Sequence, residues 1–480
     1  MSSSFRRRWI ATVSVPFVAL AGTSLAVPAN AAAASGRAID PRPARIGAAW
    51  LADELQGGLL KGQFLDSEGN AVEFADYGLS IDAAFALAAV DRRPKAVAAI
   101  TKAIAKNVDS YTTGADFGTP EDVYAGATAK TLALATDRGR NPRRFGGVDL
   151  VARMESLVLR GAPVAGRIQD RSAFGDFANV IGQGFAARGL AAVGSARANK
   201  ATRFLLRQQC DAGWFRLDFT KSLTADQTCD GRAKSVPDAD ATALSVLALI
   251  EVSKDPGASR RVDRAIKAAA SWLHDQQRSN GSLGGGTSTE KPNTNSTGLA
   301  GWVFGETGRT AAAKRAATWV RAKQADEVAP CTSALVDETG AIAYDKAAVR
   351  TGRADGITEG TTDQWRRATT QALPALAWSP AGGTASMSAP TRFVKAGSRP
   401  RVTVSDVAPG ATVCVTGGKT VRATHANRAG NASVRVLMPT RTTSVIIRAK
   451  GAGGLLAKAT INVLAGTREA RRGSVDSRVR

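Results

Sequence analysis

Two stretches of the chain repeat each other, Phe204-Leu-Leu-Arg-Gln-Gln-Cys-Asp-Ala-Gly-Trp-Phe215 and Trp272-Leu-His-Asp-Gln-Gln-Arg-Ser-Asn-Gly-Ser-Leu283. They match at an apolar start, at a Gln-Gln pair and at a glycine, which is Gly213 in the first copy and Gly281 in the second. Self-similarity of this kind is typical of an architecture that uses one supersecondary unit several times.

A second block follows each copy. Asp238-Ala-Asp240-Ala-Thr242-Ala-Leu244 aligns without gaps to Asn293-Thr-Asn295-Ser-Thr297-Gly-Leu299. Fainter second blocks begin near residues 82, 125, 179 and 363, which together with those near 240 and 295 makes six units.

The six units span a part of the chain that is rich in alanine. Apolar residues lie at helical spacing from Arg45 to about Ala377, so each unit is predicted to be a pair of helices. The second helices are richer in small residues, and closing six pairs into a ring would bury both ends without capping repeats. We therefore expect a mainly α fold, a closed two-layer ring over residues 45–378.

The composition changes at Ser379. Residues 379–390 carry no charge and are rich in Gly, Ala, Ser and Pro, which predicts a linker. Beyond it, short runs alternate apolar and polar residues with the period of two that strands have. We expect a small all-β sandwich over 391–466 and a basic, disordered tail over 467–480. The runs are Arg401–Val404, Thr412–Val415, Val434–Leu437, Val445–Arg448 and Thr460–Val463.

Residues 1–31 have the order of an export signal. Three arginines precede an apolar run from Trp9 to Val27, and small residues end at Ala31. Pro16 and Gly22 interrupt that run, which disfavours a membrane anchor, and no second run approaches the ~20 residues of a membrane-spanning helix. The protein is expected to be secreted, extracellular or associated with the cell envelope, after cleavage near Ala31.

The chain has four cysteines, and an exported protein can keep disulfides. We predict a disulfide bond between Cys210 and Cys229, within an enlarged loop. This loop is 13 residues longer than its counterpart in the next unit, because Gln208 to Asp238 spans 30 positions and Gln276 to Asn293 spans 17. Four cysteines allow three connectivities, so the partners of Cys331 and Cys414 stay open.

The net charge of +23 is unevenly distributed. Residues 391–466 contain twelve Lys and Arg against one acid, Asp406. Such an excess attracts anionic cell-wall polymers, for example teichoic acids, or an anionic membrane surface, in a salt-dependent way. A second interpretation is that the charge only secures solubility. No nucleic-acid partner is expected.

Few residues are available for metal or hydrolase chemistry. The only histidines, His274 and His425, lie far apart, and no Cys-x-x-Cys pair occurs. A zinc site needs clustered nitrogen and sulfur ligands, and Ser-His-Asp or Cys-His hydrolases need a histidine base. We expect no metal and no cofactor, and His274 is interpreted as a surface or interfacial residue.

The middle region resembles the prenyltransferase and squalene oxidase repeat family. Gln277-Arg-Ser-Asn-Gly281-Ser-Leu283 is similar to the glutamine–tryptophan motif of squalene–hopene cyclases, with leucine in the tryptophan place. Pro237-Asp238-Ala239-Asp240-Ala241-Thr242-Ala243 resembles their Asp-x-Asp-Asp-Thr-Ala motif, with Ala241 in the place of the third aspartate. The resemblance implies an α6–α6 toroid. The C-terminal part is similar to bacterial immunoglobulin-like modules.

The resemblance also implies roles for two aspartates. The middle aspartate of the cyclase motif protonates an alkene or epoxide, so Asp240 would be the general acid and Asp238 would assist it. The alternative is helix capping, because Asp and Asn before a helix accept free backbone N–H groups. The copy with Asn293 and Asn295 keeps the spacing without any acid, as capping allows. Candidate ligand contacts are Asn293, Asn295 and Trp214.

The preferred interpretation is a non-catalytic binding protein. Its ring would bind an unknown small or lipid-like ligand, and its basic β-region would contact the envelope. The alternative is a class II terpene-cyclase-like enzyme with Asp240 as acid. Cobalamin carriers have a similar two-domain order, and (α/α)6 glycosidases and lyases use paired carboxylates. Acids that could converge on one mouth of the ring are Asp82, Asp238, Asp240 and Asp363.

Overall fold

The computed structural model describes residues 38–65, 68, 70–231 and 234–465. The expected export signal over residues 1–31, its cleavage site near Ala31 and the tail over 467–480 lie outside the described residues. Among the described helices, none combines the length and the apolar character that crossing a membrane requires.

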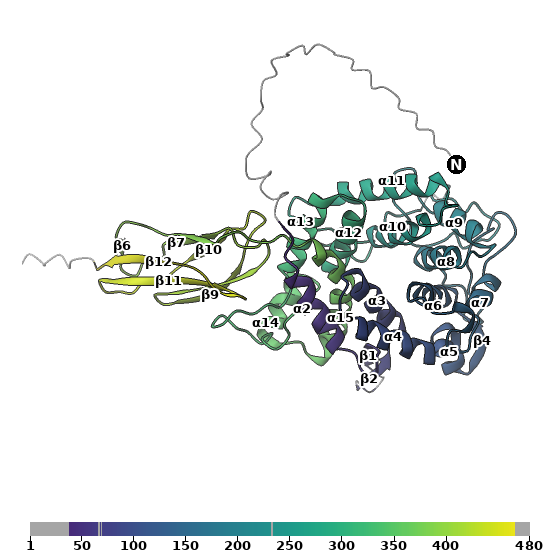
Figure 1. The fold of residues 1–480 in the computed structure, drawn as a ribbon, viewed down its shortest axis with the longest axis horizontal. Helices are drawn as coiled ribbons and strands as arrows, with labels where there is room; N and C mark the ends of the chain where they lie inside the picture. The colour runs from purple at the N-terminus through teal and green to yellow at the C-terminus, as the bar shows by residue number, and fades with distance from the viewer. Residues whose placement is uncertain (1–37, 66–67, 69, 232–233, 466–480) are drawn as a thin grey trace, which may run out of the picture.

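Six helices form the inner layer of a closed ring (Figure 1). Each contacts the next along the chain, and the last, α15, contacts the first, α3, so the circle is complete. Their small residues allow close approach and are buried on most faces. The inner helices are α3 (Tyr77–Ala89), α6 (Ala125–Asp137), α8 (Val180–Ala192), α10 (Ala239–Ser253), α12 (Thr294–Glu306) and α15 (Glu359–Ala372).

Six further helices surround the inner ones. Each packs its apolar stripe against an inner helix, and most of its charged residues are exposed, although Lys314 and Arg321 of the last outer helix are buried. The expected toroid of helix pairs is therefore confirmed by the contacts within the chain. The outer helices are α2 (Arg42–Asp53), α4 (Pro94–Lys106), α7 (Leu150–Ser156), α9 (Ala198–Leu206), α11 (Arg260–Gln276) and α13 (Thr310–Arg321).

The repeated glutamine joins neighbouring outer helices. The side-chain amides of Gln209 and Gln277 each donate to the carbonyl of the glycine four residues on and to a carbonyl of the next outer helix. Gln324 makes the same pair of bonds, to Gly340 at 3.1 Å and to Pro43 in α2 at 3.0 Å. This last bond connects the end of the ring to its beginning.

Several short elements interrupt the loops between the paired helices. Two hairpins, β1–β2 and β3–β4, precede the inner helices α3 and α6. The sequence analysis did not anticipate them. The short elements are β1 (Lys61–Leu65), β2 (Ala71–Ala75), α5 (Val108–Thr112), β3 (Thr113–Gly114), η1 (Ala115–Phe117), β4 (Thr119–Val123), η2 (Pro142–Arg144), α14 (Lys346–Asp355) and η3 (Leu373–Trp378).

The remaining strands form two sheets to one side of the ring, near α13 and α14 (Figure 1). The sheet orders are β10-β7-β5 and β6-β12-β11-β8-β9, and both contribute to one apolar core. Strand β5 lies within residues 379–390, so the stretch expected to be a linker contains a strand. The strands are β5 (Ser386–Ser388), β6 (Val394–Lys395), β7 (Arg401–Ser405), β8 (Thr412–Gly417), β9 (Thr420–His425), β10 (Ala432–Arg435), β11 (Thr443–Gly451) and β12 (Gly454–Leu464).

All four cysteines are in disulfides. The predicted bond between Cys210 and Cys229 is present and closes the enlarged loop before α10. The second bond joins Cys331, in the loop between α13 and α14, to Cys414 in β8. It therefore ties the sheets covalently to the ring.

Candidate functional site

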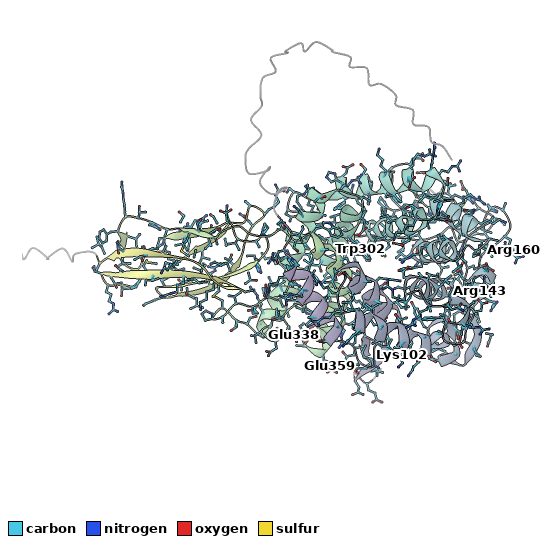
Figure 2. The ribbon with its side chains drawn as sticks, in the orientation of Figure 1. Lys102, Arg143, Arg160, Trp302, Glu338 and Glu359 are labelled. Carbon is cyan, nitrogen blue, oxygen red and sulfur yellow. A yellow bond between two sulfur atoms is a disulfide. The ribbon has the colours of Figure 1, made fainter. Side chains whose placement is uncertain are left out.

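The ring encloses a cavity of about 220 Å³. Side chains from all six inner helices line it, and Trp302 of α12 lies among them in the interior of the ring (Figure 2). The lining is mostly apolar, with a few polar groups. It comprises Asp82, Phe85, Ala86, Lys130, Ile181, Phe185, Arg188, Leu244, Leu247, Ala248, Leu299, Trp302, Thr370 and Gln371.

Two phenylalanines and an arginine form one wall of the cavity. The rings of Phe85 and Phe185 stack with centroids 5.8 Å apart and planes 16° from parallel. The guanidinium of Arg188 lies 4.8 Å from the Phe85 centroid and 5.9 Å from that of Phe185. A guanidinium above an aromatic face is a favourable contact, so this wall is held in one arrangement.

The cations of the cavity wall are paired. Lys130 Nζ lies 2.8 Å from Asp82 Oδ2, and Arg188 forms an ion pair with Asp137. Burial lowers the pKa of Lys130, but Asp82 and Tyr111 outweigh that effect and hold the pKa above its usual value. Lys130 therefore stays protonated, and the wall presents compensated charges and not a free cation.

Asp238 caps α10. Its Oδ1 accepts a hydrogen bond from the Ala241 backbone N–H at 2.8 Å. Asn293 caps α12 in the same way, through Ser296 N–H at 2.8 Å. These are the capping contacts that the sequence allowed as an alternative to catalysis. Asp238 also lines a second, polar cleft of about 280 Å³ under the enlarged loop, together with Lys234.

Asp240 is placed differently from Asp238. It lies in the first turn of α10, its Oδ1 is buried, and within the described residues that oxygen has no hydrogen-bond partner. Burial raises the pKa of its carboxyl to about 6. The hydroxyl of Ser296 opposes the shift, the carboxylate of Asp238 adds to it, and the hydroxyl of Thr289 again opposes it.

A glycine-rich loop covers both aspartates. A Cβ atom on Gly285 would lie 2.4 Å from Asp240 Oδ2, and one on Gly286 would lie 2.1 Å from Asp238 Oδ2. Neither of the two cavities described above includes Asp240 in its lining. The carboxyl of Asp240 therefore lies against this loop and does not line the central cavity.

The predicted ligand contacts do not come together. Asn293 is only 1% exposed, and its amide N–H groups donate to the carbonyls of Thr289 and Lys291 while its oxygen caps α12. This geometry argues against ligand contact by Asn293. Trp214 lines neither cavity. Asn295 lies in the first turn of α12, the position that Asp240 has in α10.

Asp82 and Asp363 lie in the N-terminal halves of α3 and α15. The inner helices run in the same direction, so these acids are at the same end of the ring as Asp238 and Asp240. Asp363 accepts a hydrogen bond from Arg367 Nε at 2.7 Å, and Arg367 also binds Asp76 at 2.6 Å. The four acids were expected to converge on one mouth of the ring, but they interact with separate partners.

The described residues contain no group of three His, Cys, Asp or Glu side chains that could hold a metal ion. His274 is half exposed at the end of α11, where its Nδ1 is 3.5 Å from Asp275. His425 lies in β9. Burial lowers the pKa of His425 to about 4, and the cations Arg353 and Lys323 add to the shift.

No protein-family model matches the chain, and no curated protein is significantly similar in sequence. Similar solved structures include a protein from Actinoplanes, with 16% identity, a TM-score of 0.47 and coverage of 71% of this chain and 99% of that one. The type II terpene cyclase MstE from Scytonema has 13% identity, coverage of 70% and 97%, and a TM-score of 0.46.

Another similar structure is the unsaturated glucuronyl hydrolase from Bacillus sp. GL1, which is responsible for glycosaminoglycan degradation. It has 12% identity, coverage of 70% and 96%, and a TM-score of 0.47. Similarity at this level does not indicate the activity of this chain.

Apart from Asp82, the sequence analysis did not identify the residues that line the cavity. Phe85, Lys130, Phe185 and Arg188 all lie in the second helices of the first three units, where the repeat is faint. Lys130 and Arg188 are charged residues within helices of otherwise small and apolar residues. A charged residue in the middle of an inner helix was the available signal, because such a residue is rarely buried unless it is paired.

Proposed function

We propose that the protein is a non-catalytic binding protein whose ring cavity holds a small, mostly apolar organic ligand. The observation that carries this proposal is the cavity itself, to which all six inner helices contribute. A mostly apolar hollow with a few fixed polar groups is the usual form of a small-molecule site. The paired states of Lys130 and Arg188 suit binding better than proton transfer.

Native mass spectrometry tests this proposal directly. The secreted protein is incubated with a lipid and metabolite extract of its host, and a discrete added mass is expected. Leu244→Trp should remove the adduct, because Leu244 lines the cavity and the larger ring would occupy it. Leu206→Trp, outside the cavity lining, is the matched control and should keep the adduct. An adduct that survives Leu244→Trp would refute the cavity as the site.

A second candidate function is supported by the buried carboxyl of Asp240. A pKa near 6 suits a general acid at neutral pH, as a class II terpene-cyclase-like enzyme would need. The same incubation should then release a transformed isoprenoid. Asp240→Asn should abolish that product while the fold is retained, and unchanged turnover would eliminate Asp240 as the acid.

We infer further that the ring belongs to the prenyltransferase and squalene oxidase repeat family and that the sheets are an immunoglobulin-like module. The boundaries proposed are 45–378 for the ring and 391–466 for the module. The two disulfides are compatible with the expected secretion. Intact-mass measurement of the protein from culture medium checks the proposed cleavage near Ala31.

We propose that the β-region contacts an anionic envelope polymer. In its sheets Arg401 lies opposite Arg435, and Arg448 lies opposite Lys458. Like charges directly opposite each other destabilise a sheet, and a bound polyanion would relieve that repulsion.

Cosedimentation with teichoic acid at 50 and 500 mM NaCl tests the envelope proposal. We expect binding at low salt, loss at high salt, and strong weakening by the double change Arg448→Glu and Lys458→Glu. Lys102→Glu with Lys106→Glu on α4 makes an equal charge change on the ring and serves as control. Equal loss in both double variants would show that only net charge matters.

A further inference from the structure

The five-stranded sheet of the β-region has one face in the apolar core and one face turned outward. Strand β11 alternates, since Val445, Ile447 and Ala449 are buried and the residues between them are exposed. Strand β12 is paired with β11, and its buried residues Ile461 and Val463 belong to the same core. The side chains between these buried positions therefore form the outward face of the sheet.

Two exposed apolar side chains lie on this outward face. Ile446, between two buried residues of β11, is 46% exposed. Val421 of β9 is 62% exposed and is opposite Thr416 of β8, which in turn is opposite Arg448 of β11. Paired residues point to the same side of a sheet, so Val421, Ile446 and Arg448 share the outward face.

Two more apolar side chains are exposed at the end of the sheet that is farthest from the ring, where β6 lies (Figure 1). Leu464 follows the buried Val463 in β12, is 46% exposed and is opposite Lys395 of β6. Phe393 directly precedes β6 and is 62% exposed. Exposed apolar side chains that gather on one face are typical of an interaction site.

Cations are interspersed with these apolar side chains. Arg448 and Lys458 are opposite each other in β11 and β12, and Lys395 lies in β6. Residues 391–466 contain a single acid, Asp406, which lies between β7 and β8. No carboxylate in the five strands therefore balances these cations, and the outward face is both apolar and positive.

The three-stranded sheet has a different outward face. Its outward residues are serine, threonine and arginine, among them Arg401 and Arg435, which are opposite each other. Of the large hydrophobic side chains that are exposed in the described part of the chain, none lies in β5, β7 or β10. Positive charge is therefore common to the two sheets, but only the five-stranded sheet combines it with exposed apolar side chains. Charge that secures solubility does not explain this difference.

We propose that the outward face of the five-stranded sheet binds the surface of an anionic lipid membrane. Its cations contact the lipid head groups, and the four exposed apolar side chains enter the apolar layer beneath them. A soluble polyanion provides partners for the cations only, whereas an anionic membrane provides both negative charge and an apolar layer. A second copy of this face is excluded, because two positive faces repel each other. This inference shares Arg448 and Lys458 with the proposed polymer contact and goes beyond it by assigning a lipid partner.

Vesicle flotation tests the inference with the secreted protein. Vesicles of equal parts phosphatidylglycerol and phosphatidylcholine are compared with vesicles of phosphatidylcholine alone, and we expect strong binding only to the anionic vesicles. Phe393→Ser with Ile446→Ser, which removes apolar surface without changing the charge, should weaken this binding by about tenfold or more. Arg448→Glu with Lys458→Glu should abolish it.

Binding of soluble teichoic acid by the serine variant of the sheet separates the lipid from the polymer. It should equal that of the parent, since the cations remain, and circular dichroism should show an unchanged fold. The matched control is Phe117→Ser with Val236→Ser, which removes side chains that are 75% and 50% exposed on the ring. Vesicle binding should survive this change. Equal loss in the two serine variants would place the contact outside the sheet and overturn the inference.

The remaining outcomes separate this inference from the proposed polymer contact. Vesicle binding that is unchanged in the serine variant of the sheet would show that only the cations act and would refute the lipid surface. Binding of teichoic acid without any binding to vesicles would refute the lipid and leave the polymer, and the reverse result would support the lipid and refute the polymer. An acidic protein that the parent binds in place of vesicles, and that the serine variant of the sheet does not bind, would assign the face to a protein partner instead.

Discussion

At the residue scale, Asp238 and Asp240 show how two carboxylates two positions apart acquire different properties. Asp238 gives an oxygen to the helix end and lies beside a polar cleft. Asp240 is turned into the protein under Gly285, where desolvation disfavours its charged form. The repeat pattern located both residues, but the difference comes from the loop that covers them, which lies over forty residues further along the chain.

The raised pKa of Asp240 predicts a pH-dependent stability. The folded pKa of about 6 lies above the unfolded value, so the stabilising contribution is present below pH 4 and is lost as the pH rises through 6. Asp240→Asn, which stays neutral, should therefore be more stable than the parent by about 1–3 kcal/mol at pH 7.5 and equally stable at pH 4.

Urea unfolding of both proteins at the two pH values measures this difference. The groups that face Asp240 and influence its pKa or are influenced by its charge are Asp238, Ser296, Thr289 and Tyr344. Asp238→Asn separates the desolvation of Asp240 from the charge of its neighbour, since it should lower the pKa of Asp240 only slightly. A stability difference between Asp240→Asn and the parent that is the same at pH 4 and pH 7.5 would contradict a raised pKa.

At the element scale, the contact between neighbouring units requires the glycine of the repeat, which makes the repeat recognisable in the sequence. Gly281 has φ of +95°, and a Cβ atom there would lie 2.4 Å from the Arg315 carbonyl oxygen in α13. Only glycine allows both this backbone conformation and this approach. The loop that carries it turns from one outer helix onto the next, so the glycine marks the contact between units.

Gly281→Ala should therefore be strongly destabilising, by about 2–4 kcal/mol, because strain and a clash with backbone add together. Gly308→Ala is the control, since φ is +72° there but no atom lies within 4 Å of the added Cβ. We expect about 1 kcal/mol for the control, from the backbone conformation alone. Thermal unfolding checks both, and similar losses in the two variants would show that the approach to Arg315 is unimportant.

Other elements could not be predicted from the sequence. Strand β9 and the hairpin β1–β2 form where the alternation of polar and apolar residues is weak, and their pairing is decided by neighbours. By contrast, the five strands with clear alternation were all anticipated near their observed positions. Most of the cavity lining was missed because it depends on which face of each inner helix points to the ring centre. Five of the six inner helices are mainly small and apolar on nearly every face, so their sequences do not single out that face.

At the scale of the whole molecule, the ring is closed by a repeat that is hard to see. Gln324 and Gly340 are the last copy of the glutamine and glycine pair, but they are 16 residues apart and not four. The bond from Gln324 to Pro43 joins residues that are 281 positions apart. The repeat count predicted closure, whereas the bonds that achieve it could be identified only in three dimensions.

Gln324→Ala tests whether the two hydrogen bonds of the Gln324 side chain keep the ring closed. The change leaves the carbonyls of Pro43 and Gly340 buried without their donor, which costs about 1–3 kcal/mol. Because the lost bond joins the two ends of the ring, hydrogen exchange should quicken in α2 and in the loop around Gly340 while α8 and α9 stay protected. Gln277→Ala removes the equivalent pair of hydrogen bonds between two consecutive outer helices, and it should quicken hydrogen exchange around α11 and α13 instead. If the two variants loosened the same helices, the ring would open as one cooperative unit and Gln324 would have no special part in closing it.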